Sequence, residues 1–362
     1  MAKLGEVCLL KAGKFVSAND ISPEYNKGLY PCFGGNGIRG YVADYTHDGE
    51  FPLIGRQGAL CGNVNLASGK FHATEHAVVV QPKIEMNVHW LYYAINAMNL
   101  GQYATGAAQP GLAVSKLETL SIEIPNISEQ NKIAQTLYKV EQLVNFRKQQ
   151  LAKLDELVKA RFVEMFGDPI RNEKGWNTYT LAEMCDGIGD GLHGTPEYDE
   201  NGEYPFINGN NLISGIIQIN PSTKKVNKKT YEKHYIKISQ NAILLSINGT
   251  LGKIAFYNGE QVMLGKSACY CNLKDEVNRI FVYNIMKTDA FARYLEDNAT
   301  KSTIKNVGLK AIREYRLIMP PIPLQNQFSS FVERVDQQKQ TVQQSLEKLE
   351  LMKKALMQEY FG

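Results

Sequence analysis

Apolar residues recur at alternating intervals of three and four along residues 125–167. The apolar positions of this segment are Ile133, Leu137, Val140, Val144, Leu151, Leu154, Val158 and Met165. Such spacing places an apolar seam along one side of a helix and is typical of a coiled coil. A helix from Ser128 to Phe166 would be roughly 58 Å long at 1.5 Å per residue. That length suits a spacer better than it suits part of a small domain.

The same pattern occurs a second time near the end of the chain. Residues 320–362 align with residues 125–167 without a gap, at a constant offset of 195 (362 − 167) that pairs Gln130 with Gln325. The chain therefore contains an internal duplication, which any prediction of the fold must include. The apolar seam of the second copy consists of Phe328, Val332, Val335, Val342, Leu346, Leu349, Leu356 and Tyr360.

Charged residues interrupt the two seams at positions that do not coincide. Lys339 in the second copy aligns with Val144, and Arg147 in the first copy aligns with Val342. Defects that alternate in this way favour two helices packed on each other. A hairpin of core helices is the alternative, but the two segments lie far apart in the sequence and carry polar outer faces.

The segments that precede the two helices have the pattern of α+β domains. In the first of them, apolar runs at residues 53–54 and 77–80 predict strands between glycine-rich turns, and residues 89–100 have apolar residues at helical spacing. We therefore expect the order domain, long helix, domain, long helix. The four segments are residues 1–124, 125–167, 168–319 and 320–362.

The second domain repeats the plan of the first more loosely. Residues 58–64 resemble residues 249–254, which are one residue shorter, and Ala77 then matches Ala268. A helix is expected again over about residues 278–298. Since the helices match better than the domains do, we expect the helices to share one task and the domains to differ in theirs.

The composition is that of an ordinary globular protein. The chain has 362 residues, of which 44% are hydrophobic, and a formal net charge of +3 at pH 7. This length fits two or three domains, and any affinity for nucleic acid must come from local basic surfaces. Six cysteines without a CxxC pair favour free thiols in a reducing compartment. Because no apolar run reaches transmembrane length, we expect a cytoplasmic protein without membrane contact.

Catalytic motifs are weak. Residues 33–37 fit the FxGxG pattern with which many methyltransferases bind S-adenosylmethionine, but they do not join a buried strand to a helix as such a loop requires. An Asn/Asp-Pro-Pro-aromatic motif is also missing. His72 and His76 lie four apart on a predicted strand, where two imidazoles do not converge on a metal, so we interpret both as structural. The sequence predicts no cofactor, no metal and no active site of its own.

A basic run lies within the second domain. Its six lysines fall within fourteen residues (237 − 224 + 1), interleaved with Tyr231, His234 and Tyr235. Ammonium groups at this density fit contact with DNA phosphates, which positions a protein without reading the base sequence. A solvated surface without a partner would show the same run. The lysines are Lys224, Lys225, Lys228, Lys229, Lys233 and Lys237.

Arginine, glutamine and asparagine side chains occur on glycine-rich loops of both domains. These side chains make the bidentate contacts that distinguish guanine and adenine in the major groove. Asparagine in such loops also serves ordinary turn geometry, so each base-reading assignment has that alternative. The candidates are Arg56, Gln57 and Asn63 in the first domain, and Asn208, Asn210, Asn211, Asn248 and Lys253 in the second.

Together these features resemble the specificity subunit of type I restriction-modification systems, and the resemblance covers essentially the whole chain. It rests on two divergent domains that alternate with two similar long helices. It also rests on the junction pattern Ile-Pro-x-x-x-x-Gln at residues 124–130. Residues 320–325 match this junction less fully, since Leu324 stands where the pattern has Glu.

Motifs within the two domains add to the resemblance. Residues 30–41 and 55–64 look like one recurrent target-recognition domain of that family, and residues 246–253 are similar to another common type. The first of these motifs contributes Asn36 and Arg39 as further DNA-binding candidates.

The resemblance implies two α/β target-recognition domains in a pseudo-twofold arrangement, separated by two long antiparallel helices that form a coiled coil. Each domain would recognise one half of a bipartite double-stranded DNA target, and the helices would set the distance between the halves. Two methyltransferase subunits would dock around the chain and supply S-adenosylmethionine, and restriction subunits would add translocation and cleavage. The chain itself would be non-catalytic. Candidate docking residues on the polar helix faces are Lys148, Gln149, Lys153, Gln340 and Gln344. A solvated helix surface without a partner is the alternative for these residues.

Two other functions are alternatives to this one. A stand-alone adenine methyltransferase would carry bound S-adenosylmethionine through purification. A scaffold that uses its coiled coil only to dimerise would show no sequence preference on DNA.

Overall fold

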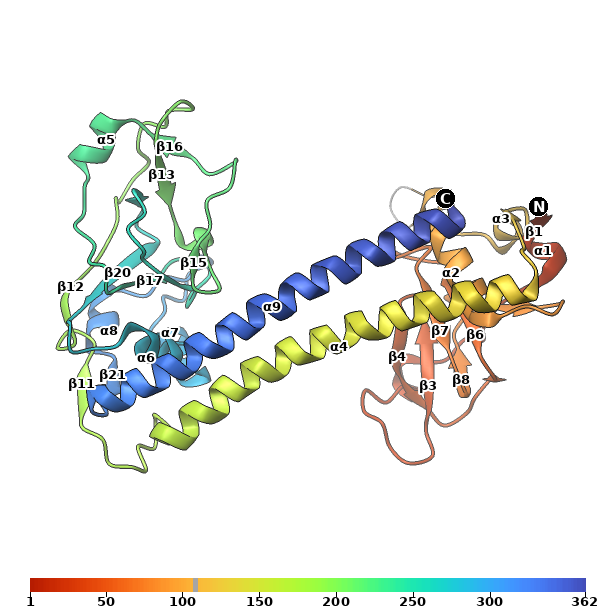
Figure 1. Cartoon of the computed structure of the whole chain (residues 1–362), viewed down its shortest axis with the longest axis horizontal. Coiled ribbons are helices and arrows are strands. Elements are labelled where there is room, and N and C mark those ends of the chain that lie inside the picture. Colours follow the sequence, from red (N-terminus) through yellow and green to blue (C-terminus); the bar gives the residue numbers. More distant parts are fainter. Residues whose placement is uncertain (107–109) are drawn as a thin grey trace. The chain divides into compact units, whose positions relative to one another are not determined.

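The computed structural model describes residues 1–106 and 110–362 (Figure 1). The chain divides into two compact units: the first comprises Met1–Gln149 and Val342–Gly362, and the second comprises Gln150–Thr341. Each unit contains one domain of strands and short helices together with about half of each long helix. The expected mixed fold, with two globular domains and two long helices, is confirmed.

The first domain consists of two four-stranded sheets, a two-stranded sheet and short helices. Its elements are β1 (Ala2–Lys3), α1 (Leu4–Val7), β2 (Cys8–Ala12), η1 (Ala18–Asp20), β3 (Tyr30–Gly34), β4 (Gly37–Val42), β5 (His47–Asp48), β6 (Phe51–Gly55), β7 (Val64–Ala67), β8 (Lys70–Ala73), β9 (Ala77–Pro82), α2 (Val88–Ala97), η2 (Leu100–Tyr103), α3 (Val114–Glu118) and β10 (Ser121–Ile122). One sheet has the strand order β2-β9-β6-β7. The other has the order β4-β3-β8-β5, in which β3 and β8 run parallel. The two-stranded sheet is β1-β10.

The central strand of the first sheet explains the apolar run that predicted it. On β9, Val78 and Val80 pack with the buried side chains around α2, whereas Val79 packs with Leu53 and Phe71 on the opposite side. A strand covered on both faces needs apolar residues at every position rather than at alternate ones. The continuous run at residues 77–80 meets this need.

The second domain shares the main sheet of the first domain but differs in its smaller sheets. Its elements are β11 (Thr178–Thr180), β12 (Cys185–Asp190), β13 (Tyr204–Ile207), η3 (Gly209–Asn211), β14 (Leu212–Ile213), β15 (Ile216–Ile217), β16 (Lys225–Val226), α5 (Lys228–Lys233), β17 (Ala242–Ser246), β18 (Ile254–Phe256), β19 (Met263–Leu264), β20 (Ala268–Leu273), α6 (Arg279–Met286), α7 (Asp289–Asp297), α8 (Leu309–Glu314) and β21 (Arg316–Ile318). The sheet order β12-β20-β17-β18 repeats β2-β9-β6-β7, and β13 pairs in parallel with β19 as β3 does with β8. The smaller sheets that differ are β16-β13-β19 and β14-β15.

Individual hydrogen bonds are conserved between the two domains as well. In the β6–β7 loop, Gly58 N–H donates to Pro110 O at 3.0 Å; in the β17–β18 loop, Gly249 N–H donates to Lys305 O at 2.9 Å. The sequence alignment of these two loops, which are of unequal length, is therefore confirmed at the level of single backbone contacts.

One part of the expected secondary structure is wrong. The single helix expected over residues 278–298 is two helices, α6 and α7, separated at Lys287 and Thr288. Thr288 begins the second helix because its Oγ1 accepts a hydrogen bond from the Phe291 N–H at 3.4 Å, which satisfies a donor at the helix start. The apolar residues keep helical spacing across this break, which is why periodicity alone missed it.

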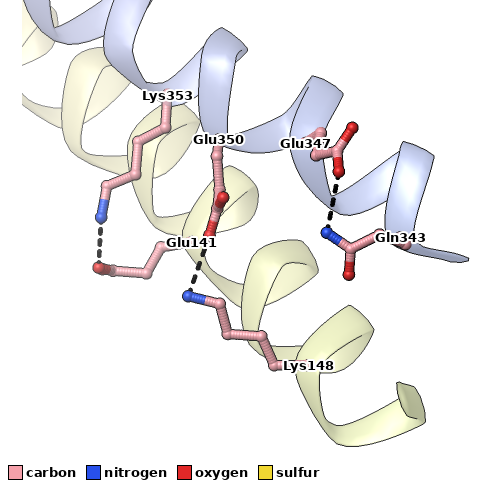
Figure 2. Close-up of polar contacts among 6 residues, drawn as sticks. All are labelled: Glu141, Lys148, Gln343, Glu347, Glu350 and Lys353. Carbon is pink, nitrogen blue, oxygen red and sulfur yellow. Dashed lines mark hydrogen bonds and ion pairs between the residues drawn. The ribbon is translucent and has the colours of Figure 1, made fainter. Parts of the chain in front are cut away.

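The two long helices are α4 (Ile127–Phe166) and α9 (Ile322–Phe361), each of 40 residues. In the first unit, Glu141 and Lys148 of α4 lie 2.7 Å and 3.0 Å from Lys353 and Glu350 of α9 (Figure 2). As the residue number rises on α4 it falls on α9, so the helices pack antiparallel there. The buried seam positions are Ile133, Leu137, Val140, Val144 and Val158 on α4, and Phe328, Val332, Val335, Val342 and Leu346 on α9.

Lysines that interrupt the seam find carboxylate partners on the other helix. Lys353 pairs with Glu141 in the first unit, and in the second unit Lys339 Nζ lies 2.6 Å from Asp155 Oδ1. Both ammonium groups are about 30% exposed, at 30% and 28%. These pairs explain how the packed helices accommodate the charged defects seen in the sequence.

The junction of the first domain with α4 depends on a buried glutamine. Gln130 is 2% exposed, and its Oε1 accepts from the Asn87 N–H at 2.9 Å while its Nε2 donates to Pro125 O at 2.8 Å. Asn87 is the N-cap of α2. Gln130 therefore fixes the start of α4 against the start of α2, which gives the glutamine of the junction pattern a structural reason.

The second unit repeats this arrangement. Gln325 is 1% exposed; it accepts from the Asn278 N–H at 3.1 Å and donates to Pro320 O at 2.7 Å. Asn278 is the N-cap of α6. The repeated Pro and Gln positions of the alignment thus make equivalent hydrogen bonds.

We expect Gln325→Ala to lower the free energy of unfolding of the second unit by about 2–3 kcal/mol, because it leaves a buried N–H and a buried carbonyl without a partner. Asn326→Ala is the matched control, since Asn326 is exposed and makes one exposed amide bond to Asn278 at 2.9 Å. Urea unfolding of both variants measures the difference. Equal effects of the two substitutions would contradict the role given to Gln325.

Among residues 1–106 and 110–362, none of the helices combines the length and the apolar character needed to cross a membrane.

Candidate nucleic-acid interface

Three loops meet at one corner of the first domain. They follow β3, join β6 to β7, and join β8 to β9. A Cβ on Gly55 would clash with the Gly35 carbonyl oxygen, and a Cβ on Gly35 would lie 3.3 Å from the His76 carbonyl oxygen. Arg56 also donates its backbone N–H to His76 O at 3.0 Å. We call residues 34–37, 56–63 and 74–76 the first-domain corner.

Several of the predicted side chains gather there. Asn63 Nδ2 donates to Asn36 Oδ1 at 2.8 Å, which links two loops 27 residues apart. Asn36, Gln57 and Asn63 are exposed, and Arg56 is half-buried. The structure therefore brings Asn36, Arg56, Gln57 and Asn63 to one surface, where amide and guanidinium groups are available to a ligand.

Arg39 lies beside this corner on β4. Its side chain is exposed, and its Cδ would lie 3.8 Å from a Cβ on Gly34. The neighbouring Cys32 thiol is buried, and burial raises its pKa, while the charge of Arg39 lowers that pKa and the charge of Glu75 raises it. The cation Arg39 and the anion Glu75 therefore both lie close enough to this buried thiol at the corner to affect its pKa.

The second domain has an equivalent corner, formed by residues 208–211, 247–253 and 265–267. A Cβ on Gly209 would clash with Ser246 Oγ and would lie 3.2 Å from the Ser267 carbonyl oxygen. Ile247 donates its N–H to Ser267 O at 3.1 Å, as Arg56 does to its own partner. The corresponding residues are Gly35 and Gly209, Gly55 and Ser246, Arg56 and Ile247, and His76 and Ser267.

Two of the predicted asparagines hold the shape of this second-domain corner. Asn211 Oδ1 accepts from the Asn208 N–H at 3.0 Å, and Asn211 Nδ2 donates to Gln218 O at 3.0 Å. Asn208 Oδ1 accepts from Ser267 Oγ at 2.9 Å. These bonds are the turn geometry that the sequence offered as the alternative to base reading. Asn210, between them, is exposed.

The remaining second-domain candidates lie on the β17–β18 loop. Asn248 Nδ2 donates to Asn306 Oδ1 at 3.1 Å, which ties the loop to the segment before α8. Lys253 is half-buried, and its carbonyl accepts from the Ser246 N–H at 2.8 Å. Gln57 occupies the place of Asn248 in the first domain, since both residues form the same isolated backbone bridge. At this equivalent backbone position the first corner therefore has a glutamine amide and the second an asparagine amide.

The basic run lies apart from this corner, on β16 and α5. It flanks the beginning of β13, whereas the corner lies beyond the end of that strand. Tyr204 of β13 and Tyr231 of α5 stack there with ring centroids 4.0 Å apart, so the short helix packs against the strand. Lys228 pairs with Glu232 at 3.8 Å across an exposed surface. Of the six lysines of the run, Lys225 is half-buried and the other five are exposed.

The turns between β8 and β9 and between β19 and β20 were not among the sequence candidates. Each supplies the third loop of its corner, at residues 74–76 and 265–267. The match of Ala77 with Ala268 was the available signal, because each turn directly precedes one of these alanines. His76, which the sequence indicated to be structural, belongs to the first of these turns.

The other histidine is structural as expected. His72 is 9% exposed, and its Nε2 lies 3.2 Å from Lys14 O. Within the described residues, no three His, Cys, Asp or Glu side chains are grouped as metal ligands.

A family model described as the type I restriction modification DNA specificity domain matches residues 1–156 and 173–351 of this chain. The specificity subunit of the Escherichia coli type I restriction enzyme EcoprrI is 52% identical over 143 residues, which are 39% of this chain and 36% of that subunit. The chain therefore matches about a third of the length of that relative. A putative type I restriction enzyme specificity subunit from Haemophilus influenzae is 25% identical over 340 residues, covering 85% of this chain and 80% of that protein.

A solved structure is also similar over its whole length. The S subunit of a type I restriction-modification system from M. genitalium aligns with a TM-score of 0.66 and 19% identity, covering 99% of this chain and 95% of that chain. At this identity the likeness concerns the fold.

Proposed function

This chain belongs to the family of type I restriction modification DNA specificity domains, and from that premise we propose that it is the non-catalytic subunit that selects the DNA target of such a system. One observation carries the proposal. Two domains with the same main sheet present equivalent loop corners, and the side chains on those corners differ, as Gln57 and Asn248 do. A shared scaffold with exchanged polar side chains is what two readers of different sequences need.

Each domain, in this proposal, reads one half of a bipartite double-stranded DNA sequence. The amides and guanidinium groups of the corners contact base edges in the major groove, where Asn and Gln distinguish adenine and Arg distinguishes guanine. Asn36, Arg56, Gln57 and Asn63 form the set for the first half-site. Asn210 and Asn248 form the set for the second half-site. Arg39 lies beside the first set, and Lys253 lies beside the second.

The two long helices are the proposed spacer. A continuous 40-residue helix measures about 60 Å at 1.5 Å per residue. Burial of the apolar seam and the ion pairs between the helices stiffen the helix pair. A stiff pair fixes both the distance and the register between the two domains, whereas a flexible linker fixes neither. In this proposal the two recognition domains are residues 1–124 and 168–319, and the spacer segments are residues 125–167 and 320–362.

The proposed partners are two methyltransferase subunits, which supply S-adenosylmethionine and the adenine chemistry, with restriction subunits joining them. The polar outer faces of α4 and α9 are the docking surfaces in this proposal. All five candidate docking residues are exposed there, namely Lys148, Gln149, Lys153, Gln340 and Gln344.

Methylome sequencing of cells with and without this gene tests the proposal. We expect a split adenine-methylated motif, with two specified blocks around an unspecified spacer, that disappears when the gene is deleted. An unchanged methylome would contradict the proposed function. Bound S-adenosylmethionine in the purified chain would instead favour a stand-alone methyltransferase.

The basic run yields a separate expectation about DNA affinity. Replacing Lys228 and Lys229 by Ala should weaken binding about equally on all sequences and reduce the slope of log K against log salt by about 1.8, because each phosphate contact contributes about 0.9. Titrations of the assembled complex at several salt concentrations measure this slope. Lys3→Ala is the control, because Lys3 is an exposed lysine outside the basic run and outside both long helices. An unchanged slope would show that the lysines do not contact phosphate.

A further inference from the structure

Unpaired polar atoms concentrate at the first-domain corner. Arg56 Nε, Thr74 Oγ1, Glu75 Oε2 and His76 Nδ1 are buried and have no hydrogen-bond partner among the described residues. Glu75 and His76 contact each other through Oε1 and Nε2, at 3.1 Å. Buried polar atoms are nearly always paired in folded proteins, and leaving one unpaired costs about 1–3 kcal/mol. The corner therefore holds hydrogen-bonding capacity that the fold itself does not use.

These side chains are able to reach a ligand. Glu75 and His76 are 34% and 40% exposed as whole side chains, so part of each side chain lies at the surface of the corner. The His76 carbonyl and the Gln57 carbonyl lie 3.3 Å and 3.6 Å from the position of a Cβ on Gly35. The turn thus borders the loops that carry the amide candidates. A ligand bound at those amides would therefore lie next to the turn that contains Glu75.

The second-domain corner has the opposite charge at the same place. Thr74 N–H donates to Phe33 O at 2.9 Å, and Gly265 N–H donates to Ile207 O at 2.8 Å, at the same register of the parallel strand pairs. The residue after each is therefore equivalent: Glu75 in the first domain and Lys266 in the second. Lys266 is exposed.

Opposite charges on one backbone position are informative. The turn itself does not depend on this side chain, because the backbone bonds of the turn are kept in both copies, with Ala77 N–H donating to Thr74 O at 2.9 Å and Ala268 N–H to Gly265 O at 3.0 Å. A carboxylate and an ammonium group instead differ in what they recognise. In the major groove a carboxylate accepts from the N4 amino group of cytosine, and a lysine donates to O6 and N7 of guanine.

Resting on the proposed function, we propose that Glu75 and Lys266 are specificity-determining residues at equivalent places in the two readers. Glu75 accepts from the amino group of a cytosine in the first half-site, and the adjacent Arg56 donates to a guanine. Lys266 donates to a guanine in the second half-site. His76 is a positioning residue, because it contacts Glu75 through Nε2 and so orients the carboxylate.

Glu75→Gln tests this assignment, because it removes the charge and one acceptor while keeping the shape. The variant is assembled with its methyltransferase subunits and offered DNA duplexes in which each position of the two half-sites is varied. We expect the preference for cytosine at one position of the first half-site to fall by about 5- to 150-fold, the range that a specific base contact supplies. The second half-site should be unchanged. Lys266→Gln should give the converse result, with loss at one position of the second half-site.

Glu85→Gln is the matched control, since Glu85 is an exposed carboxylate outside the corner. The assignment would be overturned if the variant bound all sequences equally less well without a changed base preference, or if it lost preference at no position. The proposed function would still stand in both cases, as long as the wild-type complex prefers a split sequence. A wild-type complex without any split preference would overturn the proposed function itself. If Glu75→Gln does not fold, Lys266→Gln decides the assignment alone, because its side chain is exposed and supports no contact within the domain.

Discussion

Removal of one heptad from each long helix is expected to shorten the DNA spacer by about 3 base pairs while leaving both half-site sequences unchanged. The segments to delete are residues 141–147 of α4 and residues 347–353 of α9, which remove the paired Glu141 and Lys353 together and leave the proposed docking residues in place. Seven residues correspond to about 10 Å of helix, and one turn of about 10 base pairs measures about 34 Å. A deletion of seven keeps the seam facing the partner helix, since the seam repeats every seven residues.

The readout is the methylated motif of cells that carry the shortened gene. A deletion of three residues from each helix is the control, because it rotates the seam away from its partner and should abolish methylation altogether. Altered half-site sequences with an unaltered spacer would contradict the ruler role of the helices. So would a shortened chain that still methylates the original motif.

The second large effect is expected from Phe166→Ala. Phe166 is fully buried at the end of α4, and its ring centroid lies 4.9 Å from that of Phe281 on α6 and 5.5 Å from that of Phe328 on α9. Truncating such a side chain costs about 3–5 kcal/mol, a large part of the stability of a typical domain. The substitution should therefore destabilise the second unit and remove recognition of the second half-site.

The first unit has its own buried cluster, around α2 and residues such as Trp90 and Leu137. Hydrogen exchange should consequently speed up across Gln150–Thr341 and remain unchanged in the sheets of the first domain. Val163→Ala is the control, because Val163 is 55% exposed on the same helix. Equal acceleration in both units would show that they do not unfold separately.

Much of this architecture is visible in the sequence because it is repeated. A gapless offset over 43 residues and a seven-residue seam identify both helices, and the junction glutamine is marked by its recurrence at Gln130 and Gln325. Repetition works as a signal because both copies must make the same bonds. The interruption at Thr288 was missed because an N-cap resembles any other Thr until the preceding helix is seen to end.

The recognition corners were only partly predictable. Arg56, Gln57 and Asn63 stand on a glycine-rich loop that attracts attention by composition, whereas Glu75 follows a strand with no local signal. What joins them is contact between loops far apart in the chain, such as the Arg56 N–H bond to His76 O. Residue type also did not distinguish Asn210, which is exposed, from Asn211, whose amide is bonded at both ends within the fold.

The central claim is that two readers each specify a short sequence across a gap of fixed length. Selection of bound duplexes from a random-sequence library by the chain assembled with its methyltransferase subunits tests it most directly. We expect the selected duplexes to share two short specified blocks separated by an unspecified stretch of constant length. A single continuous block, or two blocks at variable separation, would contradict it.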